Sequence, residues 1–525
     1  MFLTQGLHRS SQRHPDKTAL THVGADTTRR WTFRQMVDAV ARRAAALHGW
    51  GVRPGDRVAL VSPNDDDMVI NLLTCWWMGA VACPLNLRWS VPELDHALTD
   101  CGAALLLADV ASVPALERIT APVAMMDNDR LATRADAFEP LDDTRTGGDA
   151  LAAILYTGGT TGRSKGVALT HANFWSAALS RGAELNNSPD SVSLLVAPLF
   201  HVAGLGRLIC QCIVGGGCVT LPQFRPDAVL AAIEGLGITD IIVVPTMLQA
   251  LLDAPGFAAA RVQSIDRLSF GAAPMPADLL DRALATWPQA EFFQAYGMTE
   301  TAGAVCIDLP SRRRGATGRQ PTGTVGRAGL GAEIRIVDVA GADCPRGESG
   351  EIVVRGPMVT RGYWNLPGAS AQALRDGWLH TGDGGRMDEQ GYLYLTDRLK
   401  DMIISGGENV YPAEVEAALR GHPAVSEAAV IGVPHARWGE AVHAVVVLRR
   451  GAADAGDPAD PDALAGQLLA WCRTRLAGFK CPRSFLFTDA LPLSAAGKVL
   501  KTTLRAAHRP PTIPISTPIS TPTTP

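Results

Sequence analysis

The chain has 525 residues, of which 47% are hydrophobic and 19% are charged, and its formal net charge is −4. This length exceeds what one compact core usually holds, so at least two domains are expected. No basic excess points to nucleic acid, and we predict no nucleic-acid partner. The ten cysteines are scattered without a C-x-x-C pair or a cysteine/histidine cluster. This pattern favours buried thiols and a reducing, cytoplasmic location over a disulfide framework or a zinc site.

Two segments were considered as targeting or membrane signals. Residues 1–9 lack a basic stretch followed by an apolar stretch, so no secretory signal is predicted. The uncharged stretch Met68–Leu87 is nearly long enough to span a bilayer, but Asn71, Gly79 and Pro84 interrupt it. We therefore predict a buried helix followed by a strand, and no membrane span.

Helical and strand patterns alternate along the chain. Thr32 and Gln35 stand at capping-box spacing and predict a helix that begins near residue 32, and Ser90 and Glu93 open another helix with Pro92 in its first turn. Such alternation predicts an α/β fold, with mostly parallel sheets flanked by helices in a large N-terminal domain. Strands are predicted at 55–61, 80–85, 151–155, 241–245, 268–271, 291–295, 350–357, 428–433 and 441–448, and a helix at 411–419.

A glycine-rich stretch, Leu155–Val167, follows the apolar run 151–155. Glycines let backbone N–H groups turn around an anion, threonine hydroxyls add donors, and Arg163 and Lys165 add positive charge. The common nucleoside-triphosphate loop requires Lys and Ser/Thr directly after its second glycine, whereas Gly162 is followed by Arg163 and Ser164. The stretch indicates a phosphate-binding loop of another kind, with a flexible turn as the alternative.

Two further segments combine groups that suit a nucleotide. In Glu291–Thr301 an apolar strand runs into Tyr296, Thr299 and Glu300, which offer a ring to stack on a purine, a hydroxyl for a phosphate and a carboxylate for Mg²⁺. Asp383 is predicted on a turn, where it could accept hydrogen bonds from two ribose hydroxyls or act as a local cap.

These motifs closely resemble those of the adenylate-forming superfamily, which includes acyl-CoA synthetases, aryl-CoA ligases, luciferases and peptide-synthetase adenylation domains. The resemblance covers roughly residues 10–505, in the family's order. Gly158 stands where a serine is frequent, and Ser164 where a proline is frequent. The other matching segments are Ala197–Gly204, Gly271–Pro274, Arg398–Asn409 and Leu491–Lys501.

The resemblance implies ATP, Mg²⁺ and coenzyme A as cofactors, and it implies a role for each matching residue. The glycine-rich loop would hold the β- and γ-phosphates, Tyr296 would pack against adenine, and Asp383 with Arg398 would bind the ribose. The turn at Ser405–Gly407 would line the pantetheine channel. The implied cofactor-binding residues are Thr157, Gly158, Gly159, Thr160, Thr161, Gly162, Lys165, Gly271, Ala272, Ala273, Pro274, Tyr296, Gly297, Asp383, Arg398, Gly406 and Gly407.

The catalytic residues implied are Lys498, Thr299 at the α-phosphate, Glu300 as the magnesium ligand, and His201 beside the substrate carboxylate. Lys400 would be the hinge of a small mobile α/β C-terminal domain. The predicted domains are residues 1–397 for ATP and acid binding, 398–505 with the catalytic lysine, and a disordered Pro/Thr/Ser tail at 506–525.

The predicted activity is an AMP-forming acyl-CoA synthetase, with a small-molecule carboxylic acid as substrate; a homodimer is left open. A medium- or long-chain fatty acid is favoured because the candidate pocket wall is small and apolar. Alternatives are an aryl-CoA ligase, a ligase that loads a carrier protein, a luciferase-like oxygenase and a silent nucleotide-binding protein. Arg207 would solvate a helix end or serve as counter-ion to a polar substrate. The wall residues are His201, Val202, Gly204, Ala272, Ala295, Gly297, Met298, Ala302 and Gly303.

Overall fold

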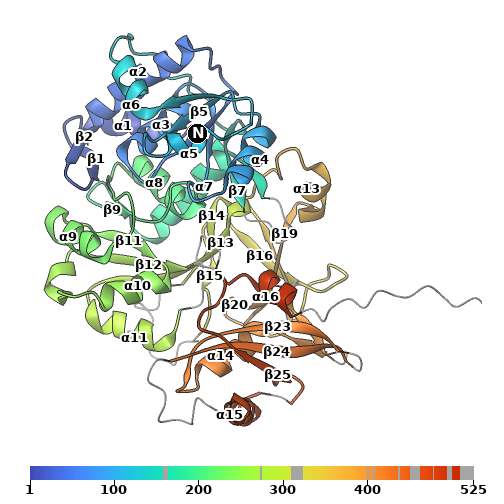
Figure 1. Cartoon of the computed structure of the whole chain (residues 1–525). Coiled ribbons are helices and arrows are strands. Elements are labelled where there is room, and N and C mark those ends of the chain that lie inside the picture. Colours follow the sequence, from blue (N-terminus) through green and yellow to red (C-terminus); the bar gives the residue numbers. More distant parts are fainter. Residues whose placement is uncertain are drawn as a thin grey trace, which may run out of the picture. The chain divides into compact units, whose positions relative to one another are not determined.

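The structure is a computed structural model that divides into two compact units. The first comprises Met1–Thr381 and Gly385–Leu395, and the second comprises Gly382–Gly384 and Thr396–Pro525. Colours from blue to yellow mark the first unit in Figure 1, and orange to red mark most of the second. The residues that the structure describes are 1–157, 164–271, 275–308, 323–398, 401–405, 408–435, 438–449, 461–476, 478–493 and 499–508.

A nine-stranded sheet is the largest sheet of the first unit. Its six central strands are mutually parallel, and antiparallel strands close both edges. In spatial order the strands are β15 (Arg327–Ala328), β14 (Gly303–Asp308), β13 (Glu291–Met298), β12 (Arg267–Gly271), β11 (Asp240–Val243), β9 (Val192–Leu195), β10 (Gly217–Thr220), β1 (Thr18–Val23) and β2 (Thr28–Thr32).

A six-stranded sheet is the second sheet of this unit, and only its last strand pair, β7–β8, is antiparallel. The central strands β3, β4, β5, β9 and β10 are almost entirely buried, as expected where helices cover both faces of a parallel sheet, whereas the edge strands β2, β6 and β15 are half-buried or exposed. The predicted α/β fold with mostly parallel sheets is confirmed. The strands are β6 (Ala124–Asp127), β5 (Leu105–Ala108), β3 (Arg57–Val61), β4 (Val81–Pro84), β7 (Leu151–Thr157) and β8 (Lys165–Thr170).

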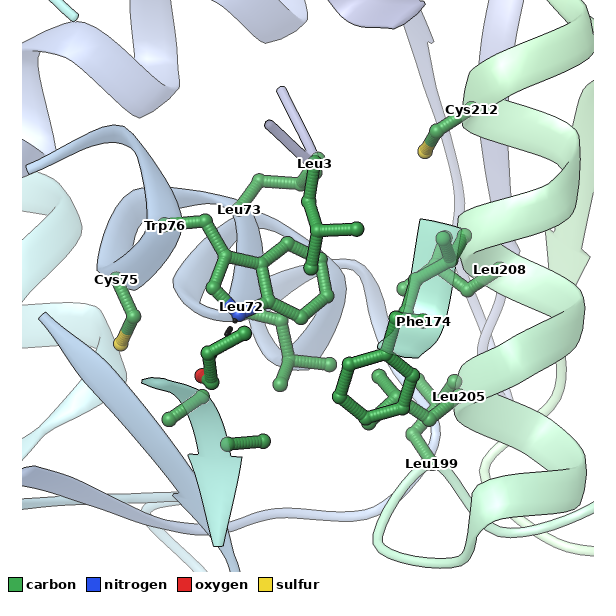
Figure 2. Packing of buried hydrophobic residues seen from close by; sticks show 14 of the residues in the cluster. Leu3, Leu72, Leu73, Cys75, Trp76, Phe174, Leu199, Leu205, Leu208 and Cys212 are labelled. Carbon is green, nitrogen blue, oxygen red and sulfur yellow. Dashed lines mark hydrogen bonds between the residues drawn. The ribbon is translucent and has the colours of Figure 1, made fainter. Parts of the chain in front are cut away.

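Three helices share one apolar core between the sheets: α3 (Asp66–Trp77) and α7 (His171–Glu184) contact strands of both sheets, and α8 (Val202–Val214) contacts strands of the nine-stranded sheet. Figure 2 shows Trp76 of α3 beside Phe174 of α7 and Leu205 of α8. The Trp76 indole N–H donates to the backbone carbonyl of Ala152 in β7 at 3.0 Å, so this buried polar group is satisfied. The shared core holds the two sheets in a fixed relation.

The remaining helices of the first unit cover the outer faces of the sheets or lie at its edges. A second apolar cluster joins α9, α10 and α11 to the nine-stranded sheet, and a third joins α4 to the six-stranded sheet. These helices are α1 (Gln5–Arg13), α2 (Phe33–Gly49), α4 (Val91–Cys101), α5 (Val113–Leu116), α6 (Asn128–Ala135), α9 (Pro226–Leu236), α10 (Pro245–Leu252), α11 (Ala277–Thr286), α13 (Pro367–Ala373), and the short η1 (Ala259–Val262) and η2 (Thr299–Thr301).

A third sheet of five strands was not predicted as a separate layer. The pairs β16–β17 and β18–β19 are antiparallel, so this sheet differs from the two mostly parallel sheets. The boundary between the compact units passes through β19 and β20. The strands are β16 (Glu333–Val337), β17 (Ser349–Arg355), β18 (Leu374–Arg375), β19 (Trp378–Met387) and β20 (Leu393–Arg398).

The second unit contains a small α/β fold with its own apolar core. The predicted helix at 411–419 is present one residue later, and the predicted strands at 428–433 and 441–448 are present with wider bounds. Its elements are β21 (Ile403–Ser405), β22 (Glu408–Val410), β23 (Val425–His435), β24 (Gly439–Leu448), β25 (Ser484–Phe487), α14 (Pro412–Arg420), α15 (Pro461–Arg473) and α16 (Lys501–Ala507).

The two helix starts that were predicted from capping boxes are present in the structure. The Thr32 hydroxyl accepts from Gln35 N at 3.2 Å, and the Gln35 amide oxygen accepts from Thr32 N at 2.9 Å. A second capping box joins Ser90 and Glu93 at the start of α4. Both predicted helix starts are confirmed because each depends only on residues three apart.

The uncharged stretch that resembled a membrane span is divided between α3 and β4, as predicted. Within the described ranges, every helix is too short or too polar to cross a bilayer. All ten cysteines are free thiols, and nine of them, including Cys210 and Cys212, are buried.

Candidate active site

The glycine-rich loop connects two antiparallel strands. Thr157 ends β7 and Lys165 begins β8, and the two residues are paired in the register. The Thr157 hydroxyl donates to the Lys165 carbonyl at 3.4 Å. Thus the buried β7–β8 hairpin places these two predicted phosphate ligands opposite each other. Residues Gly158, Gly159, Thr160, Thr161 and Gly162 lie outside the described residues.

The carboxyl ends of β12 and β13 carry the predicted adenine site. Gly271 ends β12 and pairs with Ala295 of β13, two residues before Gly297. An added Cβ at Gly297 would meet the carbonyl of Gly303, so only glycine allows β13 and β14 to approach this closely. Tyr296 is buried beside this point. Ligands of open parallel sheets bind at this edge, although Ala272, Ala273 and Pro274 lie outside the described part of the chain.

Glu300 lies in η2, directly after β13, and is only 6% exposed. Its carboxylate accepts a hydrogen bond from the Tyr363 hydroxyl at 2.8 Å, and its backbone carbonyl accepts from Thr360 N at 2.7 Å. Thr299, beside it, is half-buried. The carboxylate therefore has a fixed orientation.

Tyr363 also connects Glu300 with the hairpin of the glycine-rich loop. The Lys165 ammonium lies 5.1 Å from the centre of the Tyr363 ring, within cation–π range. One phenol thus touches a predicted phosphate ligand and the predicted magnesium ligand, which are 135 positions apart in the chain. The sequence analysis did not select Tyr363. The sequence feature that could have pointed to it is the pair of adjacent aromatic residues, Tyr363 and Trp364, shortly before Pro367.

The donor set suits magnesium bound together with a nucleotide. Mg²⁺ is usually held by one or two carboxylates and by phosphate oxygens of the substrate, and it keeps several waters. Across the described ranges no three His, Cys, Asp or Glu side chains gather as a metal cluster. A single oriented carboxylate, Glu300, near a basic phosphate-loop residue fits a metal that arrives with ATP.

His201 is the N-cap residue of α8 and is half-buried, with its ring 4.7 Å from that of Phe200. The loop before it is held by Asn64, which the sequence analysis missed. The Asn64 amide donates to the carbonyls of Leu195 and Ala197 at 2.9 and 2.8 Å, and its oxygen accepts from Leu199 N at 2.9 Å. Asn64 follows strand β3 in the motif Ser62-Pro-Asn64, typical of a turn. It sets the path of the chain into His201.

The start of α8 lies against the turn after η2. A Cβ added at Gly206 would lie 3.8 Å from the carbonyl oxygen of Ala302. By contrast, a Cβ at Gly204 would meet the carbonyls of Ala197 and Pro198. Gly204 therefore has no room for a side chain, and Val202, Met298 and Gly303 are half-buried, so the predicted pocket wall stays a prediction. Ala272 lies outside the described residues.

The environment of Arg207 differs from the one predicted. Its side chain is 1% exposed, forms an ion pair with Asp240 and donates to the Ser269 hydroxyl at 2.7 Å. Arg181 and Arg267 each lie 3.6 Å from Asp240. Burial lowers the pKa of all three guanidinium groups. The interpretations of Arg207 as a solvated helix end or as a substrate counter-ion are both wrong, because its partner is a buried carboxylate.

The predicted position of Asp383 on a turn is also wrong. It lies inside strand β19 and not on a turn, and it is buried. Gly382, directly before it, has a φ of +69°, a backbone conformation that favours glycine, and the strand continues through this residue. Arg398 ends β20, which pairs with β19. The Arg398 side chain and residues Lys400, Gly406, Gly407 and Lys498 lie outside the described residues, so their assignments stay predictions.

Comparisons with known proteins place the chain in a family. Residues 7–364 match the profile of the AMP-binding enzyme family, and residues 414–498 match that of the AMP-binding enzyme C-terminal domain. The chain therefore belongs to the AMP-binding enzyme family, and the predicted resemblance to the adenylate-forming superfamily is confirmed.

Three relatives illustrate the match. A feruloyl-CoA synthase of Amycolatopsis sp is 43% identical over 95% of this chain and 97% of its own. The long-chain-fatty-acid–CoA ligase FadD13 of Mycobacterium tuberculosis is 36% identical over 93% and 95%. The structure of o-succinylbenzoate coenzyme A synthetase (MenE) from Bacillus subtilis with ATP and a magnesium ion is 34% identical, covers 95% and 98%, and has a TM-score of 0.82. The prediction of an AMP-forming acid–thiol ligase is confirmed at the level of the enzyme class.

Proposed function

We propose that this protein uses ATP and Mg²⁺ to activate an aromatic monocarboxylic acid of the hydroxycinnamate type and transfers it to coenzyme A. The observation that carries the first half of this proposal is the contact of one phenol, Tyr363, with both Lys165 and Glu300. This contact joins the phosphate-loop hairpin to the carboxylate suited to magnesium.

The substrate class has two supports. The feruloyl-CoA synthase shares 43% identity over nearly the whole chain. In addition, Arg207 is the only charged residue between Val202 and Pro222, and it is buried and paired with Asp240. A second carboxylate on the substrate would therefore find no cation on α8, which favours a monocarboxylate over a dicarboxylate. A fatty acid remains the second candidate, supported by the 36% identity to a long-chain-fatty-acid–CoA ligase.

In the first half-reaction, a carboxylate oxygen of the acid forms a bond to the ATP α-phosphorus while pyrophosphate leaves. Lys165 and the glycine-rich loop hold the β- and γ-phosphates, Thr299 holds the α-phosphate, and Tyr296 packs on adenine. Magnesium at Glu300 supplies positive charge to the phosphates. Lys498 adds a cation at the transferring group, and His201 borders the acid.

In the second half-reaction, the coenzyme A thiol loses its proton, its sulfur forms a bond to the acyl carbon, and AMP leaves. We assign nucleotide and acid binding to residues 1–397 and the catalytic lysine to residues 398–505. Lys400 is the hinge that exchanges Lys498 for the pantetheine channel at Gly406 and Gly407. Asp383 and Arg398 hold the ribose through both steps.

The test is pyrophosphate release with ferulic, cinnamic, octanoic, palmitic and o-succinylbenzoic acids, with and without coenzyme A. We expect acid-dependent release, the highest kcat/KM with ferulic acid, and a thioester product identified by mass spectrometry. A preference for palmitic acid would select the fatty-acid candidate. Release that requires an acid but ignores coenzyme A would favour a carrier-protein acceptor, and no release with any acid would overturn the proposal.

Two variants test the half-reactions separately. Lys498→Ala is expected to abolish adenylate formation but to retain thioester formation from a supplied acyl-adenylate, because Lys498 acts only in the first half. Lys400→Pro is expected to do the reverse. If Lys498→Ala lost both halves equally, the assignment of Lys498 would be wrong.

A further inference from the structure

Residues 360–364 form a short segment that connects the two parallel sheets at the site. Ala168 N donates to Gly362 O at 3.0 Å and Trp364 N donates to Gly166 O at 2.7 Å, so the segment pairs with β8 of the six-stranded sheet. At its other end, Thr360 N donates to Glu300 O, beyond β13 of the nine-stranded sheet. Three backbone hydrogen bonds therefore hold this segment at its two ends, and the Thr360 hydroxyl adds a side-chain bond to the Ala168 carbonyl at 2.5 Å.

The side chain of Tyr363 makes two further contacts, which are not part of the backbone pairing. Its hydroxyl donates to Glu300 Oε1 at 2.8 Å, and its ring faces Lys165 Nζ at 5.1 Å. A hydrogen bond to a carboxylate is stronger than one between neutral groups and fixes the orientation of its acceptor. The ring limits the positions that the flexible lysine side chain can take.

We propose that Tyr363 is a positioning residue for Mg²⁺-bound ATP: its hydroxyl orients Glu300 for the metal and its ring places Lys165 for the phosphates. This inference rests on the proposed function. Groups that hydrogen-bond to metal ligands typically change metal affinity or activity by about 10–100-fold when they are lost. Tyr363 thereby couples the predicted metal ligand Glu300 with the predicted phosphate ligand Lys165.

Tyr363→Phe tests the hydroxyl without disturbing the rest. Phenylalanine keeps the ring beside Lys165 and the backbone pairing with β8. The matched control is Tyr394→Phe, because Tyr394 has the same two kinds of partner in the third sheet. Its hydroxyl donates to Asp388 at 3.0 Å and the Arg386 guanidinium lies 4.1 Å from its ring. Both tyrosines are half-buried, so loss of a hydroxyl should affect folding similarly.

The measurement is ATP affinity by calorimetry on the full chain, with Mg²⁺ and separately with EDTA, and thermal unfolding of each variant alone. We expect Tyr363→Phe to weaken affinity about 10-fold or more with Mg²⁺ and less than about 2-fold in EDTA, whereas Tyr394→Phe matches the wild type. Tyr363→Leu, which also removes the ring, should additionally weaken binding in EDTA.

Two results would overturn the assignment. One is equal affinity of Tyr363→Phe and Tyr394→Phe with Mg²⁺, and the other is an equal loss with and without the metal. Both leave the proposed ligase intact as long as the wild type binds Mg²⁺-bound ATP and releases pyrophosphate with an acid. Failure of the wild type itself to bind ATP would instead overturn the proposed function.

Discussion

Charged side chains gather at both ends of strands β11, β12 and β13, but the two groups are arranged differently. At the amino ends, Asp240 is surrounded by Arg181, Arg207 and Arg267, and it also accepts from the Ser193 hydroxyl at 3.1 Å. At the carboxyl ends, Glu300 follows β13 and reaches Lys165 only through the ring and hydroxyl of Tyr363.

The difference separates structure from function. Charges that close on one another inside the protein hold elements together and have little left to offer a ligand. A carboxylate and an ammonium held apart by a phenol are oriented but not neutralised by each other, as a site for a metal and a phosphate requires. Burial of a charged residue, by itself, therefore does not identify the active site.

The largest expected effect is on the amino-end cluster. Asp240→Asn leaves the buried guanidinium of Arg207 and the half-buried ones of Arg181 and Arg267 without their carboxylate, and we expect the free energy of unfolding to fall by about 3–5 kcal/mol. Urea denaturation measures this change. The control is Asp253→Asn, since Asp253 pairs with Arg282 on the surface and should cost no more than about 1 kcal/mol. Equal losses in both variants would contradict the structural role of the cluster.

Glu300→Gln should show the opposite behaviour at the carboxyl ends. The amide keeps the hydrogen bond from Tyr363 but loses the negative charge that magnesium needs. We expect acid-dependent pyrophosphate release to fall about 10²–10³-fold while the free energy of unfolding changes by less than about 1 kcal/mol. Glu333→Gln, at a surface ion pair with Arg355, serves as control. Wild-type release by Glu300→Gln would remove Glu300 from the site.

His171 is a third buried titratable side chain, and it is uncharged at neutral pH. His171 begins α7, its Nδ1 accepts from Leu3 N at 3.3 Å, and burial lowers its pKa to about 4. The unfolded histidine gains its proton near pH 6.5, whereas the folded one gains it only near pH 4. Stability should therefore be complete above pH 6.5 and fall between pH 6.5 and 4, by up to about 3 kcal/mol.

The check is the pH dependence of urea unfolding for the wild type and His171→Asn, which keeps an acceptor for Leu3 N but does not titrate. The difference between the two curves should change by up to about 3 kcal/mol across this range. Parallel curves would show that another group causes the loss.

The smallest expected effect concerns the close approach of β13 and β14. Gly297→Ala should cost about 1–3 kcal/mol, because the new methyl group meets the Gly303 carbonyl. We also expect weaker ATP binding, since Tyr296 is the neighbouring residue. Gly235→Ala is the control: its Cβ meets no described heavy atom within 4 Å in α9, so it should stabilise by about 0.5–1 kcal/mol. Stability equal to the wild type in Gly297→Ala would show that the hairpin can open at no cost.

Much of the architecture was predictable from the sequence. The capping boxes at Thr32 and Ser90 and the strand β7 before the glycine-rich loop depend on residues close together in the chain. The prediction for Asp383 failed because the glycines on both sides of it are typical of a turn, whereas here they allow a continuous strand, β19. The third sheet was missed as a layer because strand pairing is not encoded within any one segment.

The sequence by itself determined the family, the order of the motifs and the chemical types at the site, because short-range spacing specifies loops, caps and strand ends. Only the tertiary structure decided which charges neutralise each other and which face a ligand. Arg207 meets Asp240, and Tyr363 meets both Lys165 and Glu300, through strand register and helix packing that bring distant segments together. Because the strength of an electrostatic contact depends on distance and burial, no local pattern could distinguish the two.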